Sequence, residues 1–543
     1  MTEANEARPP REAGGDGRAP ALARRRAIIF FAGGAALLLI MIFARIMNYD
    51  LRRDEQIYVP PALLLSDFDL YEDIFFNHTP ASAWLFRAAK ILTGSESLLF
   101  PARLVVFAAW AGLAAAVAGV SWRLTASAGM TAFLFLAVMT NDAFLSVTGM
   151  AATNNFLPLP LIYLGAGLFF IGVGGSRPSP WLFLASGVLL GLAGSIKISA
   201  ALAGPVLFGA ALFLPRGVSF AARMRDVAGP LAVGGLIGAA PILVYLKNAP
   251  DKFLAHVVDW HIGPHADFWR SQPPEPLEAA MALPGKAALG YIVWSVGANA
   301  IMIAAFLTLV FILAARRGAA KALDARILAC AALFAVLALG SFLPTPSFPQ
   351  YFSPPIVVAP LLLALLYARL DGAERARAGA ALAAMSVVLV VMNLPRLTMD
   401  LARLPFPERW ETAKVHRDGL AVADAMAAAG ASGKVATLAP LYPLEGGLAV
   451  YRELATGPFA YRAAPFTPPA LAERLVLIGP HEIEAFLEAD PPGALLLGFM
   501  PEFEGPFLRF ADRHGYRALE GFSIKGRDCS CKLYVRASAA GAT

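Results

Sequence analysis

Charged residues are scarce in this sequence. Only 15% of its 543 residues are Asp, Glu, Lys or Arg, whereas soluble domains contain roughly 25%. Hydrophobic residues make up 58% of the chain, and the mean hydropathy is +0.60. This composition excludes an ordinary soluble protein and predicts a chain that crosses a membrane many times.

Cysteine is scarcer still, with only Cys330, Cys529 and Cys531. This set offers neither a disulfide framework nor the spacing of a zinc site. Cys529 and Cys531 would point to one face of a strand, where a disulfide closes a very tight, strained ring. We therefore predict two free or partly oxidised thiols without a function.

Signs of nucleotide or nucleic-acid binding are also missing. The part of the chain after residue 395 contains no GxGxxG or GxxxxGK[ST] phosphate loop. The net charge of +6 and the pI near 9.2 do not indicate a nucleic-acid partner. The basic residues fall instead in short loops between apolar runs, where they set membrane topology.

Long apolar runs are abundant. A membrane-spanning helix needs about 20 mostly apolar residues, and the runs predict about eleven spans. They lie near residues 27–47, 101–122, 129–148, 155–174, 180–196, 199–214, 228–246, 289–314, 327–343, 353–368 and 378–394. Residues 1–26 are expected to form a disordered cytoplasmic tail. The first run is too long for a signal peptide and lacks a cleavage site, so we expect an uncleaved anchor.

Arginines between the runs give the predicted orientation. If the first span runs outward, every inner loop carries at least one arginine, as cytoplasmic loops do. We therefore expect a multi-pass protein of the bacterial cytoplasmic membrane with its N-terminus inside. The outer face would then hold loop 48–100, the span ends around Asp142 and Asn154, loop 247–288, Pro344 to Phe352, and everything after residue 395.

Loop 48–100 gathers the polar residues that such a chain otherwise lacks. Its acidic pair Asp54-Glu55 follows the first span by a few residues, and it is either a solvated face or a reaction centre. Segments 54–65 and 81–92 mix apolar and polar positions in the way of interfacial helices. Trp84 would lie at headgroup depth, in contact with membrane lipids.

The chain changes character after residue 395. Strand-like segments alternate there with helix-like ones, which predicts a small extracytoplasmic α/β domain over 395–543. The strand-like segments are 434–438, 494–499, 516–523 and 531–536, and the helix-like segments are 411–429, 482–489 and 503–514. The transmembrane domain would then comprise residues 27–394.

The acidic pair Asp54-Glu55, with Tyr58 one turn later, resembles the first outer loop of the GT-C class of integral-membrane glycosyltransferases. The segment Leu70 to Pro80, followed by Trp84-Leu85, is similar to the second part of that loop in protein O-mannosyltransferases and lipid A aminoarabinose transferases. Gly191 to Lys197 resembles the family's lysine at an outer helix end. Gln350-Tyr351-Phe352, followed by prolines, resembles its late aromatic-proline span. The resemblance covers the layout of 27–394 and implies a sugar donor carried on polyprenyl phosphate.

The sequence departs from the family at two places. The second outer loop reads Ala152-Thr-Asn154-Asn155-Phe156, with amides where the family often has an acid, and Asp142 is a candidate substitute. His78 stands where the aminoarabinose branch has a lysine before the prolines. Both departures leave the particular sugar open.

Sugar transfer requires a base that takes the proton of the acceptor hydroxyl. Neighbouring helix positions point about 100° apart, so only one of Asp54 and Glu55 can face the sugar. We predict that Asp54 is the base, while Glu55 orders the loop or binds a cation. The departing phosphate needs donors or positive groups. The predicted donor-binding residues are Arg53, Tyr58, His78 and Lys197, although Lys197 can instead snorkel and His78 can instead bond the loop backbone.

Four further residues are predicted to contact the acceptor or complete the second loop: Asp142, Asn155, His261 and Tyr351. His261 and His265 have a spacing that binds metals on a helix, but Gly263-Pro264 between them argues against a regular helix. We predict no metal site and no certain cofactor, and a divalent cation stays open. Tyr351 is more typical of packing or of the membrane interface than of a sugar platform.

Together these features predict an α-helical polytopic membrane bundle with interfacial helices in its first outer loop and a small α/β domain. The predicted activity is inverting transfer of a sugar from polyprenyl phosphate to a lipid, glycan or protein at the outer face. Alternatives are a ligase or polymerase of lipid-linked oligosaccharides, a transporter or flippase, and a non-catalytic scaffold. A transporter predicts mid-span charges and repeated halves, and the sequence has few such charges and no evident repeat.

Overall fold

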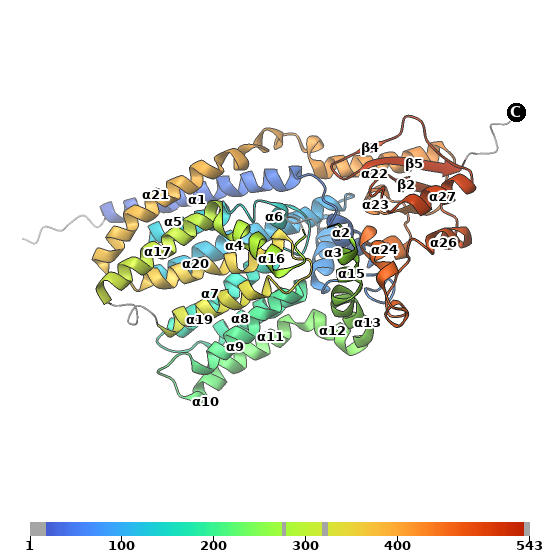
Figure 1. Cartoon of the computed structure of the whole chain (residues 1–543). Helices are drawn as coiled ribbons and strands as arrows, with labels where there is room; N and C mark the ends of the chain where they lie inside the picture. Colours follow the sequence, from blue (N-terminus) through green and yellow to red (C-terminus); the bar gives the residue numbers. More distant parts are fainter. Residues whose placement is uncertain (1–17, 274–278, 318–323, 537–543) are drawn as a thin grey trace, which may run out of the picture.

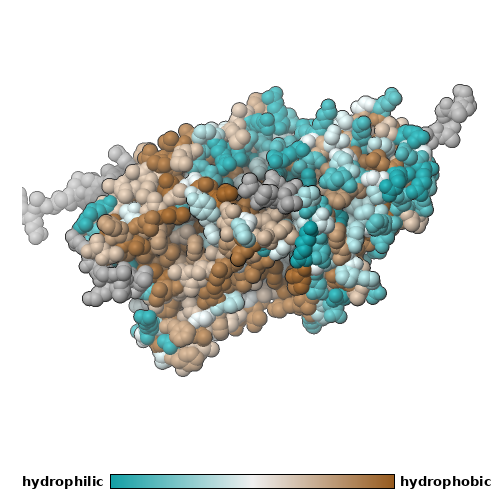
Figure 2. All heavy atoms as spheres, in the orientation of Figure 1, coloured by the Kyte–Doolittle hydropathy of each residue, from teal (hydrophilic) through white to brown (hydrophobic). Residues whose placement is uncertain are grey.

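The computed structural model describes residues 18–273, 279–317 and 324–536. Its apolar helices lie side by side in an elongated bundle, and the strands lie beyond one end of that bundle (Figure 1). Figure 2 shows apolar side chains over the bundle and hydrophilic ones over the strand-containing end. Helix α1 (Arg18–Asn48) begins earlier than expected, so residues 18–26 are helical rather than disordered. Residues 1–17 of the predicted tail lie outside the described residues.

Within the described residues, five helices are long and apolar enough to cross a membrane, or six if one bent pair counts as a single span. The five are Ile29–Asn48 of α1, α4 (Leu99–Thr125), Gly297–Ala315 of α17 (Gly297–Arg317), η4 (Pro349–Phe352) with α20 (Ser353–Ala368), and α21 (Gly372–Thr398). The bent pair joins α10 (Phe220–Arg223), η2 (Met224–Ala228) and α11 (Gly229–Gly238) to α12 (Ala240–Asn248) at 62°.

The other predicted spans overlap shorter apolar helices, so the number of membrane crossings stays a prediction. These helices are α5 (Ala128–Met139), α7 (Pro158–Gly174), α8 (Pro180–Ile196), η1 (Ile198–Leu202) with α9 (Ala203–Phe213), and α19 (Ala325–Gly340). The expectation of one continuous span over 289–314 is wrong, because α16 (Leu283–Ser295) ends before α17 begins. Gly297 has φ +56° at this break, and a Cβ there would overlap the Asp142 carboxylate.

Helices α8 and α11 pack with their backbones in contact. A Cβ added at Gly187 or Gly191 would come within about 2.2 Å of backbone oxygens of α11. Gly234 and Gly238 stand in the same relation to α8. Small residues at such crossings allow the close approach on which helix association in lipid depends. This crossing fixes the end of α8, and therefore the position of Lys197.

The predicted interfacial helices are α2 (Glu55–Leu64) and α3 (Ala81–Thr93). Helix α3 exposes Ile91 and Leu92, as an interfacial helix should. Helix α2 does not lie on a surface, because its residues 55–62 are all buried. The expectation of a surface helix there was wrong because the C-terminal region covers it: Gln56 Oε1 accepts a hydrogen bond from Leu441 N at 2.9 Å.

The remaining short helices connect these parts. They are α6 (Val147–Met150), α13 (Pro250–Leu254), η3 (Ala255–Asp259), α14 (Trp260–Ile262), α15 (Pro264–Ser271), η5 (Leu401–Arg403) and η6 (Pro407–Arg409). In the C-terminal region they are α23 (Leu441–Glu445), η7 (Arg452–Leu454), α24 (Pro458–Ala463), η8 (Ala464–Phe466) and α25 (Pro469–Ala472).

The C-terminal region contains a mixed five-stranded sheet of order β1-β2-β5-β3, with β4 paired to β5. The β1–β2 pair is parallel and the other pairs are antiparallel. The strands are β1 (Val435–Thr437), β2 (Ala494–Leu497), β3 (Tyr516–Ala518), β4 (Ile524–Lys525) and β5 (Ser530–Arg536). Helices α22 (Glu411–Ala428), α26 (Ile483–Ala489) and α27 (Gly505–Arg513) accompany it. Each strand-like segment of the sequence therefore contains a strand.

Cys529 and Cys531 form a disulfide in the structure, whereas the sequence predicted free or partly oxidised thiols. Their Cα atoms are 5.3 Å apart, within the ordinary range for bridged cysteines. Both residues are buried at the start of β5.

A buried carboxylate joins the C-terminal region to the bundle. Glu445 is 3% exposed, and its oxygens accept hydrogen bonds from the backbone of Leu98 and Leu99 at 3.0 and 2.8 Å. These amides belong to the N-terminal end of α4, where an anion is favoured by the helix dipole. The same carboxylate binds His416 of α22 at 2.9 Å.

Candidate active site

A cavity of about 1020 Å³ lies between the end of the bundle and the C-terminal region. Its lining comes from the α1–α2 loop, residues 77–79, the ends of α8 and α19, helices α14 and α15, and the segment before α20. The C-terminal region adds residues between 459 and 528. Six basic residues line the cavity against three acids: Arg52, Arg53, Lys197, Arg270, Arg462 and Arg527, against Asp54, Glu502 and Asp528. This excess of positive charge favours an anionic ligand.

Asp54 lines this cavity from the N-cap position of α2. Its side chain makes no capping hydrogen bond, and within the described residues it forms no ion pair at 4 Å or less. Burial raises the pKa of the Asp54 carboxyl above its usual range, while Arg462, Arg52 and Arg53 act in the opposite direction. An unpaired carboxylate with a raised pKa has the properties of a general base.

Glu55 has the opposite environment. It is fully buried and forms a bidentate pair with buried Arg103, at 3.0 and 2.9 Å. Its oxygens also accept from the backbone of Arg52 and Ala152, at 2.9 and 2.8 Å. Arg103 in turn donates to the carbonyl of Ile46 at the end of α1. Glu55 therefore ties α1, α2, α4 and the segment after α6 together, and it does not line the cavity.

Tyr58 and His78 form a hydrogen-bonded pair on the cavity wall. Asn154 Nδ2 donates to the Ile196 carbonyl, so its Oδ1 accepts from Tyr58 Oη at 2.8 Å. The Tyr58 hydroxyl has one proton, and it therefore accepts from His78 Nε2, 2.7 Å away. Burial and the neighbouring His261 and Lys197 hold the pKa of His78 well below its usual value. His78 is thus a neutral donor that orients Tyr58.

Lys197 follows α8 in an extended conformation and points into the same cavity. Its Nζ donates to Asn155 Oδ1 at 2.5 Å and lies 4.6 Å from the ring centroid of Tyr351. Burial lowers the pKa of Lys197 to about 7, and Asp54 opposes that shift. The ammonium group of Lys197 therefore contacts two other predicted residues, Asn155 and Tyr351, from separate parts of the chain.

The predicted residues Arg53 and His261 also line the cavity. Arg53 lies 3.6 Å from Asp528 of the C-terminal region. His261 Nε2 donates to the Asn77 carbonyl at 2.7 Å, and His265 lies beside it with ring centroids 5.6 Å apart. Burial lowers the pKa of both histidines. Among the described residues, no three His, Cys, Asp or Glu side chains are grouped to hold a metal ion.

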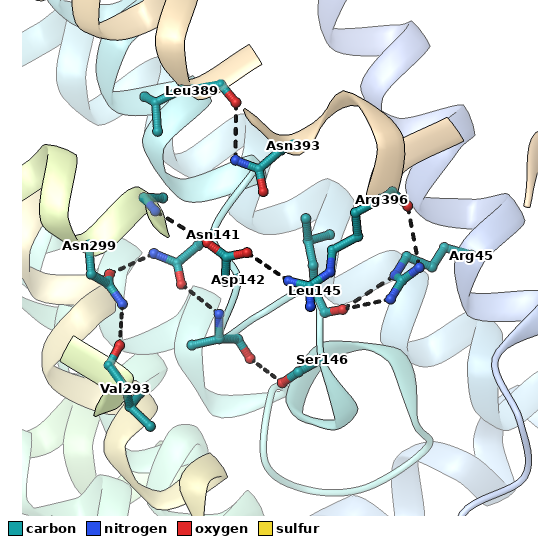
Figure 3. A network of polar contacts seen from close by, with 12 residues as sticks. Arg45, Asn141, Asp142, Leu145, Ser146, Val293, Asn299, Leu389, Asn393 and Arg396 are labelled. Carbon is teal, nitrogen blue, oxygen red and sulfur yellow. Dashed lines mark hydrogen bonds and ion pairs between the residues drawn. The ribbon is translucent and has the colours of Figure 1, made fainter. Parts of the chain in front are cut away.

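Asp142 is the predicted residue that the structure places elsewhere. Its carboxylate binds Arg396 at 2.7 Å and the backbone of Ala298 at 3.3 Å (Figure 3). It lines a separate cavity of about 490 Å³ beside α21. The chain leaves helical geometry after α5 and directs Asp142 toward the α16–α17 break. Asp142 therefore lies outside the cavity that holds Asp54, and its substitution for the missing acid of the second loop stays a prediction.

Arg462 and Trp269 also line the cavity, and neither was predicted from the sequence. Arg462 belongs to α24 of the C-terminal region, to which the sequence assigned no function. Trp269 belongs to α15, in the loop where the sequence singled out His261 and His265. The aromatic-rich segment from Phe268 to Arg270 was the only local signal, and it does not reveal a contact with a residue almost 200 positions later.

The sequence matches no known family profile and no curated protein. The fold is similar to that of ArnT, a lipid A aminoarabinose transferase, from Cupriavidus metallidurans. The TM-score is 0.62 with ArnT bound to undecaprenyl phosphate and 0.61 with its apo state, at 14% identity, over 94% of this chain and 98% of that one. A weaker match, with a TM-score of 0.45 and 10% identity over 93% of this chain and 74% of that one, is the apo oligosaccharyltransferase of Archaeoglobus fulgidus. The predicted resemblance to the GT-C class is confirmed at the level of the fold.

Proposed function

We propose that this protein, which has the fold of ArnT, is an integral-membrane glycosyltransferase that takes a sugar from a polyprenyl-phosphate carrier. One observation carries the proposal. Asp54, an unpaired carboxylate, shares a cavity with Lys197, while the adjacent Glu55 is buried in an ion pair with Arg103. A base and a cation in one cavity are what transfer from a phosphate to a hydroxyl requires.

In the proposed reaction Asp54 takes the proton of the acceptor hydroxyl while that oxygen bonds to the anomeric carbon. The bond from this carbon to the phosphate oxygen breaks on the opposite side, so the configuration inverts. Negative charge grows on the leaving phosphate, and protonated Lys197 stabilises it. Arg53 adds positive charge to the same cavity. Tyr58, oriented by His78 and Asn154, shapes the wall beside them.

The donor class is supported by the fold. ArnT, with which this chain shares its fold, was solved with undecaprenyl phosphate bound. The apolar exterior of the bundle gives a polyprenyl chain a surface to lie against (Figure 2). The acceptor is a lipid, a glycan or a protein that brings a hydroxyl to Asp54.

The proposed orientation has the N-terminus in the cytoplasm and the cavity and C-terminal region outside. It is supported by the arginines of the predicted inner loops. Reporter fusions at Gly217 and Gly433 should report opposite sides of the bacterial cytoplasmic membrane. Fusions that report the same side would place the cavity away from an external acceptor.

The direct test is transfer of radiolabelled sugar from polyprenyl phosphate by the purified protein in detergent. The acceptor can be found by mass spectrometry of envelope lipids and glycans from cells with and without the protein. A glycan or lipid that loses one sugar in the absence of the protein, and regains it with wild type but not with Asp54→Asn, would support the proposal. An unchanged envelope in cells that lack the protein would contradict it.

A further inference from the structure

Arg462 is buried in the cavity without a partner. It is 7% exposed and lies among three aromatic rings, with its guanidinium carbon 4.7, 5.2 and 4.9 Å from the centroids of Phe268, Trp269 and Phe459. Within the described residues it makes no hydrogen bond and no ion pair. A guanidinium has five N–H donors, so all of them are unmatched.

This arrangement leaves the guanidinium donors open to the cavity, where the oxygen atoms of a ligand can reach them. Aromatic faces attract the cation, but they do not replace the oxygen acceptors that water provided. Arg462 also stays charged at neutral pH, although burial lowers its pKa to about 10. Donors that the protein leaves unmatched at a cavity wall are available to a ligand, and an oxyanion supplies charged acceptors for them.

A second unmatched donor lies beside the first. Trp269 Nε1 is buried and has no hydrogen-bond partner among the described residues. Its ring contacts Arg462, and both residues line the cavity. Arg462 therefore offers its donors at a cavity wall where Trp269 carries a further unmatched N–H, which suits an oxyanion.

This pair is distinct from the Lys197 group. Lys197 already holds Asn155 and Tyr351 on the bundle side. The charged neighbours that act on Arg462 are Arg53, Asp54 and Glu502, whereas Asp54 is the one that acts on Lys197. Asp54 is thus the charged group that acts on both cations.

We propose that Arg462 and Trp269 form a second oxyanion subsite, which binds a carboxylate or phosphate group of the acceptor while Asp54 receives its hydroxyl. This inference rests on the proposed function, in which Lys197 serves the donor phosphate. The C-terminal region then selects the acceptor, and acceptors without an anionic group are poor substrates.

The test uses two probes on the full-length protein in a maltoside detergent, which carries no phosphate. Farnesyl phosphate represents the donor lipid, and inorganic phosphate is titrated calorimetrically after farnesyl phosphate has saturated its site. Wild type should bind inorganic phosphate under these conditions. Arg462→Met should weaken this binding roughly ten- to a hundredfold, the loss expected for a charge-assisted hydrogen bond. The affinity of Arg462→Lys should lie between those of wild type and Arg462→Met, because lysine keeps the positive charge but lacks the paired N–H donors of the guanidinium.

The controls separate the two sites. Lys197→Met should weaken the binding of farnesyl phosphate and leave the affinity for inorganic phosphate unchanged. Arg474→Met removes a half-exposed arginine of the same region, paired with Asp259 and outside the cavity lining, and should change neither affinity. Melting temperatures identify any variant that does not fold, and Arg462→Lys tests the subsite if Arg462→Met is unstable.

Three outcomes overturn the subsite: wild type fails to bind inorganic phosphate once farnesyl phosphate is present, a folded Arg462→Met binds inorganic phosphate as tightly as wild type, or Arg462→Met weakens the binding of farnesyl phosphate instead. A different outcome bears on the proposed function alone. If wild type does not bind farnesyl phosphate, yet binds inorganic phosphate in a way that depends on Arg462, the donor assignment fails while the subsite stands.

Discussion

The two walls of the cavity are built on different principles. On the bundle wall, Tyr58, His78, Asn154, Asn155 and Lys197 are held by hydrogen bonds to one another or to nearby carbonyls. On the C-terminal wall, Arg462 is held by aromatic packing alone. The first wall is preorganised before any ligand binds, and the second keeps its donors free. We infer that the bundle wall carries the common chemistry and the C-terminal wall carries selectivity.

Asp54→Asn is the sharpest test of the bundle wall and should have the largest effect. Asparagine keeps the size of the side chain but cannot take a proton at neutral pH. Loss of a general base typically slows a reaction by about 10² to 10⁴. The variant should still fold and bind undecaprenyl phosphate, as measured by melting temperature and calorimetry. Turnover near the wild-type rate would remove Asp54 from the role of base.

Replacement of Glu55 should affect stability rather than chemistry. Breaking a buried ion pair leaves an uncompensated charge and costs about 3–5 kcal/mol. Glu55→Leu and Arg103→Leu should therefore each lower the free energy of unfolding, and the double variant should be more stable than either single one. If Glu55→Gln is fully folded and inactive while Asp54→Asn is active, the two acids have exchanged roles.

Lys197→Met should weaken binding of the donor lipid. The expected effect is smaller than the loss of rate in Asp54→Asn. A hydrogen bond to a charged group contributes about 1.5–3 kcal/mol, or roughly ten- to a hundredfold in affinity. His78→Ala should weaken donor use less, because it only frees Tyr58 to rotate. The Kd of undecaprenyl phosphate, measured by calorimetry, checks both. A wild-type Kd for Lys197→Met would mean that this lysine only positions Asn155 and Tyr351.

Donor binding should also depend on pH. The pKa of Lys197 is lowered to about 7, so the protonated form that attracts phosphate is lost as pH rises through that value. The Kd of undecaprenyl phosphate should rise above pH 7, by at most about tenfold per pH unit. Lys197→Arg should flatten this dependence, since arginine stays charged. An equal pH dependence in Lys197→Arg would assign the titration to another group, such as the phosphate itself.

The smallest expected effect concerns the join between the walls. Glu445→Gln keeps one acceptor oxygen but loses the charge that binds Leu98, Leu99 and His416. We expect a loss of about 1 kcal/mol in stability. Faster hydrogen exchange at the amides of Leu98 and Leu99, with unchanged exchange in the middle of α4, would show that the loss of stability is confined to this contact. Unchanged exchange at both amides would show that the contact does not hold the walls together.

The sequence was most informative where local pattern and chemistry coincide. Apolar runs locate helices because the bilayer imposes their composition. Asp54 and Lys197 could be singled out because each stands at the polar end of such a run. The pairing of Glu55 with Arg103 could not be predicted, because it depends on α1, α2 and α4 meeting at one point. The burial of α2 and the subsite at Arg462 depend likewise on where the C-terminal region docks.

Glu445 has a consequence for how this protein can evolve. A carboxylate on one side of residue 398 caps a helix that begins on the other side. Recombination that exchanged only the C-terminal part would inherit a helix end without its acceptor, unless the incoming part carried an acid at the same place. The cavity wall that we assign to acceptor choice therefore cannot drift or be shuffled as an independent module. New acceptor preferences should arise by point substitution around Arg462, within a lineage that keeps both halves together.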